Sequence, residues 1–346
     1  MSTDALAVAE GLLSQPTVPF IEDLPAAHVR AFADERGLAR TTDAAGNLVV
    51  KYGAGTPLVL VAHLDHPGFH VAGNHLDFKG GLVAAHAVEG APLHFFRRGS
   101  MEPIGEGVLT SATADERGFL RTATADRYEG DFAMWGFPGW SIEDGRVTAR
   151  VCDDLLGAAA ILAVFDDLVH SQPSTCVWGL FTRAEEEGFL GAFEAIRLAT
   201  VPRDADVLSL ECSKALPHAP QGGGVIVRVG DRMSIFDPSL TAALEAAAGK
   251  VDGLTFQRRL MDGGACEATA FCAAGYRASG VAVPLGGYHN AADEGFGIVP
   301  ETVMVSDYLA EVALLTSLAH NPDLLAPQGQ PAWFADRAEK ARQALA

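Results

Sequence analysis

One short apolar segment, residues 57–62, constrains the fold of this chain more than any other feature. It reads Pro-Leu-Val-Leu-Val-Ala, which is the length of a strand and offers no polar side chain to water on either face. Strands of this kind lie inside parallel sheets that helices cover on both sides. His63 and Asp65 follow directly, so polar side chains begin where the buried strand ends. The segment therefore predicts an α/β fold with polar chemistry at one edge of its sheet.

Strand-like and helix-like segments alternate along most of the chain. The predicted strands cover residues 48–52, 57–62, 175–182, 206–211 and 280–284. The predicted helices cover residues 4–14, 24–36, 156–170, 188–199, 239–248, 301–320 and 332–345. Alternation of elements with these lengths favours a mostly parallel central sheet with helices on both faces.

Residues 68–145 differ from this pattern, because short β-type runs alternate with turns there and helical periodicity is scarce. Such runs begin at Leu82, Pro92, Gly107, Gly118 and Phe132. At a typical size of about 150 residues per domain, the chain has room for about two domains. We therefore predict an all-β insertion at 68–145, inside an α/β domain formed by residues 1–67 and 146–346.

The composition excludes several classes of partner. The formal net charge is −19 at pH 7, which argues against nucleic acid and anionic membranes. The longest uncharged apolar run, residues 155–165, is shorter than the roughly 20 residues of a membrane helix. Residues 1–15 lack the basic cluster of a secretory signal. The five cysteines form no CxxC pair, so we expect no disulfide framework and a cytoplasmic location.

The strongest polar clusters lie where predicted strands end. They are His63 with Asp65, Asp153 with Asp154, Glu185 to Glu187, Glu211, and Tyr288 with His289. Only Asp153 and Asp154 lack a preceding core strand, and they come just before a predicted helix. Ligand sites in open α/β sheets lie at the carboxyl ends of the strands, so we expect these five segments to meet at one edge. Taken singly, the glutamates would suit a helix start and Asp153 a helix cap.

Several carboxylates in one cleft repel one another unless a cation compensates their charge. Two histidines with three or four carboxylates suit one or two divalent ions, with zinc, cobalt or manganese the best match. A hydrolytic site with two metals also needs a base that takes a proton from water. Glu185, which stands beside the candidate ligand Glu186, can fill that role.

Five motifs in this order resemble the co-catalytic metallopeptidases. They are His63-x-Asp65, Asp153-Asp154, Thr182-x-x-Glu185-Glu186-x-Gly188-x-x-Gly191-Ala192, Glu211 and Tyr288-His289. The wide gap between His63 and Asp153, filled by β-type sequence, resembles the M42 family of glutamyl and leucyl aminopeptidases in particular. The resemblance extends over residues 12–318.

This resemblance implies a role for each matched residue. It implies two ions and five ligands: His63 and Glu211 on one ion, Glu186 and His289 on the other, and Asp153 bridging both. Glu185 matches the general base. Asp65 matches the carboxylate that orients His63 from behind. A cis peptide bond between Asp153 and Asp154 is implied as well.

Three positions depart from the usual M42 pattern. Glu211 stands where Asp is commoner, and Leu155 follows Asp154 where Arg is usual. The late glycine motif ends in Glu267 rather than in Thr-Asp. The longer carboxylates can shift the amine-binding end of the pocket. Glu267 is a candidate for recognising the substrate amine, with a surface loop position as the alternative.

The function implied is that of a metal-dependent aminopeptidase, a hydrolase that removes N-terminal residues from peptides with a free N-terminus. The cofactors implied are two divalent ions, with zinc ahead of cobalt and manganese. The insertion at 68–145 is expected to mediate homo-oligomers, from dimers up to dodecamers.

Three other functions have to be weighed. An M20-like dinuclear hydrolase, acting as a dipeptidase or an N-acyl amino acid deacylase, would share the metal site but accept blocked N-termini. A glycosidase needs facing carboxylates, which the adjacent Glu185 and Glu186 do not provide. A metal-binding assembly protein without turnover would lack a base, whereas Glu185 is present. The histidines at 66, 70, 75, 86 and 94 fit no common zinc motif.

Overall fold

The computed structural model describes residues 5–81, 83–292, 296–326 and 332–345. Its centre is a mixed sheet in the order β1-β2-β12-β3-β13-β17-β15-β16, with β14 paired to β17. The strands are β1 (Ala39–Thr42), β2 (Leu48–Tyr52), β3 (Leu58–His63), β12 (Val177–Thr182), β13 (Asp206–Ser209), β14 (Cys212–Lys214), β15 (Val225–Asp231), β16 (Phe256–Met261) and β17 (Arg277–Leu285). The four central strands, β12, β3, β13 and β17, are parallel neighbours. All six residues of β3 are buried.

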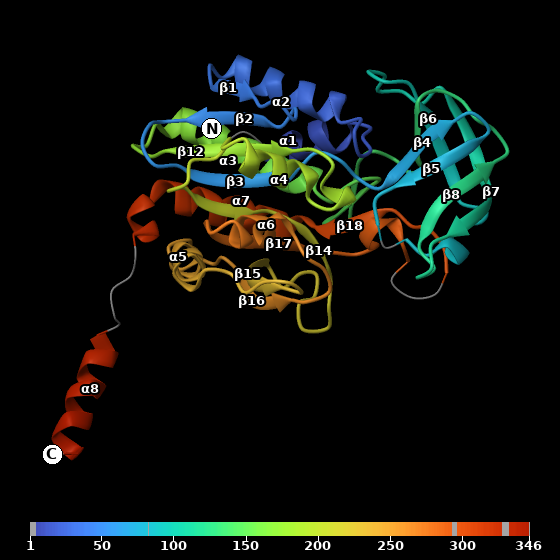
Figure 1. Ribbon diagram of the computed structural model, residues 1–346. Coiled ribbons are helices and arrows are strands. Elements are labelled where there is room, and N and C mark those ends of the chain that lie inside the picture. Colours follow the sequence, from blue (N-terminus) through green and yellow to red (C-terminus); the bar gives the residue numbers. More distant parts are fainter. Residues whose placement is uncertain (1–4, 82, 293–295, 327–331, 346) are drawn as a thin grey trace.

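Helices cover both faces of this sheet (Figure 1). They are α1 (Ala5–Leu13), α2 (Asp23–Glu35), α3 (Leu155–Ser171), α4 (Leu190–Arg197), α5 (Pro238–Ala248), α6 (Glu267–Ala273) and α7 (Val305–His320). A further helix, α8 (Ala332–Leu345), lies apart from the sheet. Short 3-10 turns lie at Ala85–Ala87, Glu185–Glu187, Tyr288–Asn290 and Pro322–Leu325. The fold class expected from the sequence is therefore confirmed.

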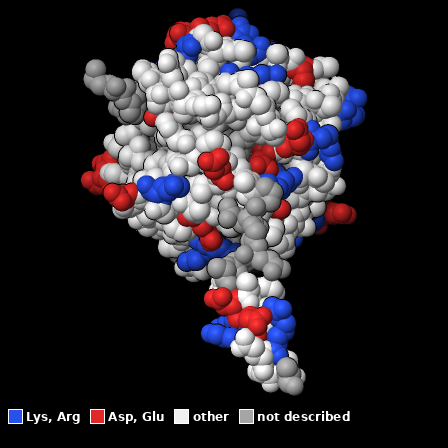
Figure 2. Space-filling view, turned by 90° about the vertical axis from the view of Figure 1, so that its left-hand side faces the viewer, with Lys and Arg blue, Asp and Glu red and all other residues white. Residues whose placement is uncertain are grey.

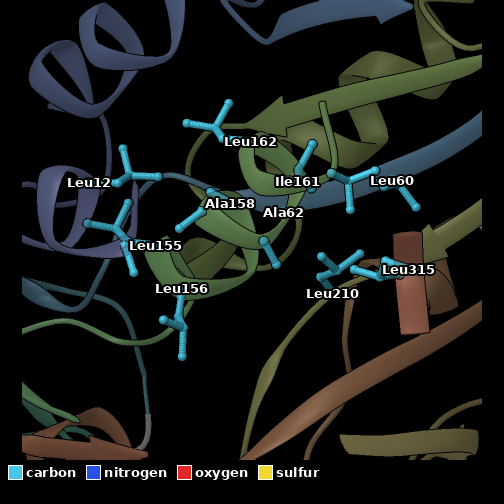
Figure 3. Close-up of a cluster of buried hydrophobic side chains, with 14 of the residues drawn as sticks. Leu12, Leu60, Ala62, Leu155, Leu156, Ala158, Ile161, Leu162, Leu210 and Leu315 are labelled. Atoms are coloured by element: carbon cyan, nitrogen blue, oxygen red, sulfur yellow. The ribbon is translucent and has the colours of Figure 1, made fainter. Parts of the chain in front are cut away.

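Strand β3 shows why two layers of helices are needed. Leu60 and Ala62 lie in one buried cluster with Ala158 and Ile161 of α3 (Figure 3). Val59 and Val61 point to the other face and belong to the cluster that α4 and α6 complete. Each aliphatic side chain buried in this way contributes about 1.5–3 kcal/mol. Because side chains along β3 point alternately to the two faces of the sheet, helices have to cover both faces. The carboxyl end of β3 stays available for the site.

A closed antiparallel barrel stands at one end of the molecule (Figure 1). Its strands are β4 (Gly68–Ala72), β5 (His75–Lys79), β6 (Pro92–Phe96), β7 (Gly105–Ala114), β8 (Leu120–Ala125) and β9 (Phe132–Trp135). Phe69 and Trp135 meet edge to face in its core, with ring centroids 5.0 Å apart. The run expected from Leu82 begins at a residue outside the described ones. The limits 68–145 of the insertion stay a prediction.

A small sheet corrects one predicted helix. The helix expected over 301–320 begins only at Val305, because β18 (Glu301–Met304) pairs antiparallel with β11 (Arg146–Ala149). Strand β10 (Ser141–Glu143) completes this sheet. Thr302 and Val303 are β-branched and suit a strand better than a helix. The first four residues of the predicted helix therefore form a strand, and Glu301 at its start lies close to the site.

The last helix, α8, extends away from the rest of the chain (Figure 1) and has the bounds expected from the sequence. Figure 2 shows acidic and basic side chains interspersed on α8 and over the face that it displays. Among the described residues, no helix is long and apolar enough to cross a membrane.

Candidate metal centre

The structure brings the five expected metal ligands together at the carboxyl edge of the central strands. They are His63 at the end of β3, Asp153 just before α3, Glu186 in the turn after β12, Glu211 between β13 and β14, and His289 in the turn after β17. Their ligand atoms form three overlapping groups within 4.8 Å: His63 with Glu185 and Glu186, His63 with Asp153 and Glu211, and Asp153 with Glu186 and His289. Segments far apart in sequence therefore converge on one small volume.

Asp153 lies between the two histidines, with one oxygen toward each. Its Oδ1 is 3.5 Å from Nε2 of His63, and its Oδ2 is 3.7 Å from Nε2 of His289. The other ring nitrogen of each histidine faces a backbone carbonyl. Nδ1 of His63 donates to the carbonyl of Asp65 at 3.1 Å, and Nδ1 of His289 to that of Gly81 at 2.7 Å. Each Nε2 thus faces Asp153, which is the orientation that metal-binding histidines adopt.

Several buried carboxylate oxygens of this centre have no hydrogen-bond partner among the described residues. They are Oδ1 of Asp153, Oε1 of Glu186 and Oε1 of Glu211. A buried carboxylate without a partner is costly unless it is protonated or coordinates a cation. The donor set, two imidazoles and three carboxylates, is one that divalent transition ions prefer. The residues present therefore fit a metal centre. The peptide bond between Asp153 and Asp154 is cis, which confirms that expectation.

Burial and crowding shift the pKa values of the centre strongly. Burial, reinforced by Glu211 and Glu186, raises the pKa of Glu185 well above its ordinary value. Burial also raises the pKa of Glu211 to about 8. Burial alone would lower the pKa of His289, but Glu186 and Asp153 outweigh it and raise the value to about 9. The site therefore holds protons at neutral pH that a bound cation would displace.

The carboxylate of Asp65 lies between His63 and the Glu185 segment. It accepts hydrogen bonds from the backbone N–H groups of Glu185 and Glu186, at 3.0 and 3.1 Å. Its Oδ1 is 3.6 Å from Nδ1 of His63, whose hydrogen bond goes to the Asp65 carbonyl. Asp65 thus holds the Glu185 segment directly, and its role in orienting His63 stays a prediction.

Two buried residues that the sequence did not single out hold the backbone around the ligands. Glu301 accepts from the N–H groups of Cys152 and Asp153 through Oε2 and from that of His289 through Oε1. His66 faces the Asp153 carbonyl at 2.8 Å and Oδ1 of Asn290 at 2.9 Å. From the sequence alone, His66 is considered together with His70, His75, His86 and His94. The structure places His66 beside Asp153 instead. No local motif marks either residue, because each contacts partners far away in sequence.

A cavity of about 70 Å³ lies beside Glu211. Lys214, Met261 and Tyr288 line it together with Arg228. The Arg228 side chain is buried, and its Nε and Nη1 have no hydrogen-bond partner among the described residues. The cavity therefore places a guanidinium next to a candidate metal ligand, with two nitrogens that lack a hydrogen-bond partner among the described residues.

Glu267 is buried rather than on a surface loop. Burial raises its pKa to about 7. The histidines at 70, 75, 86 and 94 join none of the metal-ligand groups found in the described part of the chain.

A family model matches the part of the chain that carries most of these residues. The family model of the M42 glutamyl aminopeptidases matches residues 118–294, just over half of the chain. That stretch contains Asp153, Glu185, Glu186, Glu211 and His289.

Solved structures share the fold at low identity. A TET aminopeptidase from the marine sediment archaeon Thaumarchaeota archaeon SCGC AB-539-E09 has a TM-score of 0.77 at 18% identity, over 93% of this chain and 99% of that one. The TET1 peptidase of Pyrococcus horikoshii, which can assemble into a tetrahedron or a large octahedral shell, has a TM-score of 0.73 at 21% identity, over 91% and 99%. An aminopeptidase of Desulfurococcus kamchatkensis has a TM-score of 0.75 at 17% identity, over 95% and 98%. With both the family model and the fold in agreement, this chain belongs to the M42 glutamyl aminopeptidase family.

Proposed function

We propose that this chain is an aminopeptidase that uses two divalent metal ions and the general base Glu185 to remove N-terminal residues from peptides. The observation that carries the proposal is the position of Asp153, whose two oxygens face Nε2 of two different histidines. A carboxylate in that position can bridge two ions. Zinc suits the mixed imidazole and carboxylate donors best.

In the proposed mechanism, His63 and Glu211 would hold one ion, Glu186 and His289 would hold the other, and Asp153 would contribute to both. When bound, such ions polarise the scissile carbonyl and lower the pKa of a water molecule in the site. Glu185 is buried, and its Oε2 lies 3.9 Å from Nε2 of His63. It accepts the proton of the attacking water and donates it to the leaving amine. Its pKa is raised by burial, which favours the protonated form that the second of these steps needs.

The cavity beside Glu211 supports a preference for acidic N-terminal residues. A buried guanidinium without a partner costs free energy that a substrate carboxylate can offset. Two nitrogens of the buried Arg228 guanidinium have no hydrogen-bond partner among the described residues, and Lys214 lies on the same cavity wall. The glutamyl activity in the family description agrees with this substrate class.

We also propose that the chain self-associates through its barrel. The P. horikoshii relative assembles into closed shells, and the barrel here stands at one end of the molecule (Figure 1). Light scattering at micromolar concentrations tests the proposal, and a monomer throughout would contradict it. All five cysteines are free thiols, which supports a cytoplasmic location.

The function is tested by metal analysis together with a panel of free and N-blocked aminoacyl and peptide substrates. We expect two ions per chain, hydrolysis of substrates with a free N-terminus, and loss of activity on chelation with recovery on adding Zn²⁺. Selective hydrolysis of N-blocked substrates would favour the M20-like alternative instead. Activity that survives complete removal of metal would contradict both.

A further inference from the structure

The segment after strand β5, residues 80–81, contacts the candidate metal centre at two points. Nδ1 of His289 donates to the Gly81 carbonyl at 2.7 Å. The backbone N–H of Gly80 donates to Oε1 of Glu187, also at 2.7 Å. These glycines directly follow a strand of the barrel, whereas Glu187 and His289 follow strands of the central sheet. The centre is therefore completed by a segment of the barrel.

Both contacts serve the same proposed ion. A carbonyl can only accept a hydrogen bond, so Nδ1 of His289 carries a hydrogen and Nε2 is the nitrogen that a metal ion can bind. That Nε2 lies 3.3 Å from Oε1 of Glu186. Glu187 is the next residue after Glu186, so its bond to Gly80 holds the backbone beside the second ligand. One short segment thus contacts His289 directly and Glu186 through the residue that follows it, and these two residues are assigned to the same ion.

The position of this segment is closely defined. Gly80 has a φ of +107°, and a Cβ there would lie 2.9 Å from Cβ of Pro67 and 3.0 Å from its Cα. Any larger residue at position 80 must therefore move the loop. A Cβ on Gly81 would meet no described atom within 4 Å. Gly81 can therefore be replaced by alanine while its carbonyl stays in place. Alanine at position 80 and alanine at position 81 thus form a matched pair of substitutions, of which only the first should move the loop.

We propose that Glu187 is a positioning residue, which holds the 80–81 segment so that the Gly81 carbonyl orients His289. Docking of the barrel onto the central sheet and loading of the ion at Glu186 and His289 are then coupled. Glu187 is an exposed side chain in a run of three glutamates whose other two members have proposed roles at the metals. The inference rests on the proposed two-metal site.

The deciding experiment compares Glu187→Ala with Glu187→Gln in the full chain. Removing the acceptor should weaken one of the two Zn²⁺ affinities about 10- to 100-fold, the usual cost of losing a group that supports a metal ligand. Competition with a chromophoric chelator measures both affinities, and elemental analysis after dialysis counts the ions. Glu187→Ala should then retain closer to one ion per chain than two. Glu187→Gln keeps an oxygen acceptor and should restore both affinities.

The glycine pair tests the loop itself. Gly80→Ala should show the same loss of one ion, whereas Gly81→Ala should bind two ions as the wild type does. Hydrogen exchange gives a readout that does not depend on activity. Because coupling is reciprocal, Zn²⁺ should slow exchange of the Gly80 amide in the wild type and should slow it less in Glu187→Ala.

Wild-type affinities for both ions in Glu187→Ala would overturn the inference, and so would equal behaviour of the two glycine variants. A wild-type protein that binds no second ion would instead overturn the proposed two-metal function. The two failures are therefore distinguishable.

Discussion

The carboxylates of Glu22 and Asp65 lie behind the segment 184–186 and together accept hydrogen bonds from its three consecutive backbone N–H groups. Oε1 of Glu22 accepts from Ala184 at 3.1 Å, and Asp65 accepts from Glu185 and Glu186. Oε2 of Glu22 also pairs with Nε of Arg183 at 2.8 Å. Ala184 has a φ of +50°, an uncommon conformation for a residue with a side chain. Two carboxylates thus fix a turn that would not adopt this shape alone.

Glu22→Gln should therefore impair the site without touching a ligand. The amide keeps one oxygen acceptor, but its NH₂ group opposes the Arg183 guanidinium. We expect metal affinity to fall about 10-fold, at the lower end of the effect for groups that support ligands. Activity measured against Zn²⁺ concentration should recover at high metal. Glu194→Gln, which breaks an exposed pair with Arg197, serves as the control and should change neither quantity.

The neighbouring carboxylates Glu185 and Glu186 should give opposite phenotypes. Glu185→Gln removes the proposed base but no ligand, so it should keep two ions and lose about 10²–10⁴ in turnover. Glu186→Gln should lose metal first, and excess Zn²⁺ should restore part of its activity. Elemental analysis alongside kcat separates the two. An exchange of phenotypes would show that the assignment of base and ligand is shifted by one residue.

The metal-free protein should become less stable as the pH rises from about 6 to about 9. Burial raises the pKa values of Glu211 and Glu311 from 4.5 to about 8. The pKa of His289 is raised from 6.5 to about 9, because the charges of Glu186 and Asp153 outweigh the opposite effect of burial. The folded state therefore holds protons that the unfolded chain has already released, so the free energy of unfolding falls with pH in this window. Thermal unfolding in chelator should show Tm decreasing from pH 6 to pH 9.

Glu311→Gln should flatten that decrease, because Glu311 is buried, is no proposed ligand and has no partner for either oxygen among the described residues. Glu116→Gln, at an exposed position, should leave the decrease unchanged. Zn²⁺ should also flatten it, because metal binding requires deprotonated ligands. A Tm of the metal-free protein that rises over this range would contradict the prediction.

Arg228 should determine the preference for acidic residues. Arg228→Leu should lower kcat/KM for a glutamyl substrate about 10- to 100-fold, which corresponds to losing a hydrogen bond to a charged group. Hydrolysis of a leucyl substrate should change little or improve. Arg258→Leu removes an exposed arginine on β16 that pairs with Glu245, and it should leave both rates unchanged. Equal losses on both substrates would assign Arg228 a structural role instead.

The sequence predicted the core of the site well because local patterns carried the information. The apolar run that became β3 ends at His63, and the rule that ligands gather at strand ends then placed Glu185, Glu211 and His289 with it. The burial of β3 on both faces could likewise be anticipated from its composition alone.

Groups that act across long sequence distances could not be predicted in this way. Glu22 and Ala184 are 162 positions apart, and Glu301 and Cys152 are 149 apart. Nothing in the segment around either glutamate distinguishes a backbone-holding carboxylate from a solvated one. The local sequence around Glu301 predicts the start of a helix. In the structure Glu301 lies in β18, which pairs with β11, a strand about 150 residues earlier in the chain.

The closed barrel has a consequence for how such a protein can change over time. A sheet that closes on itself leaves no unpaired strand, so it offers neighbouring chains no backbone hydrogen bonds to capture. Contacts made through its outer surface must come from side chains alone. Substitutions there can change which copies recognise one another without disturbing the barrel's ladder of backbone bonds or the sheet that carries the chemistry. Assembly and catalysis can therefore diverge separately within one lineage, except at the two glycines where the barrel reaches the ligands.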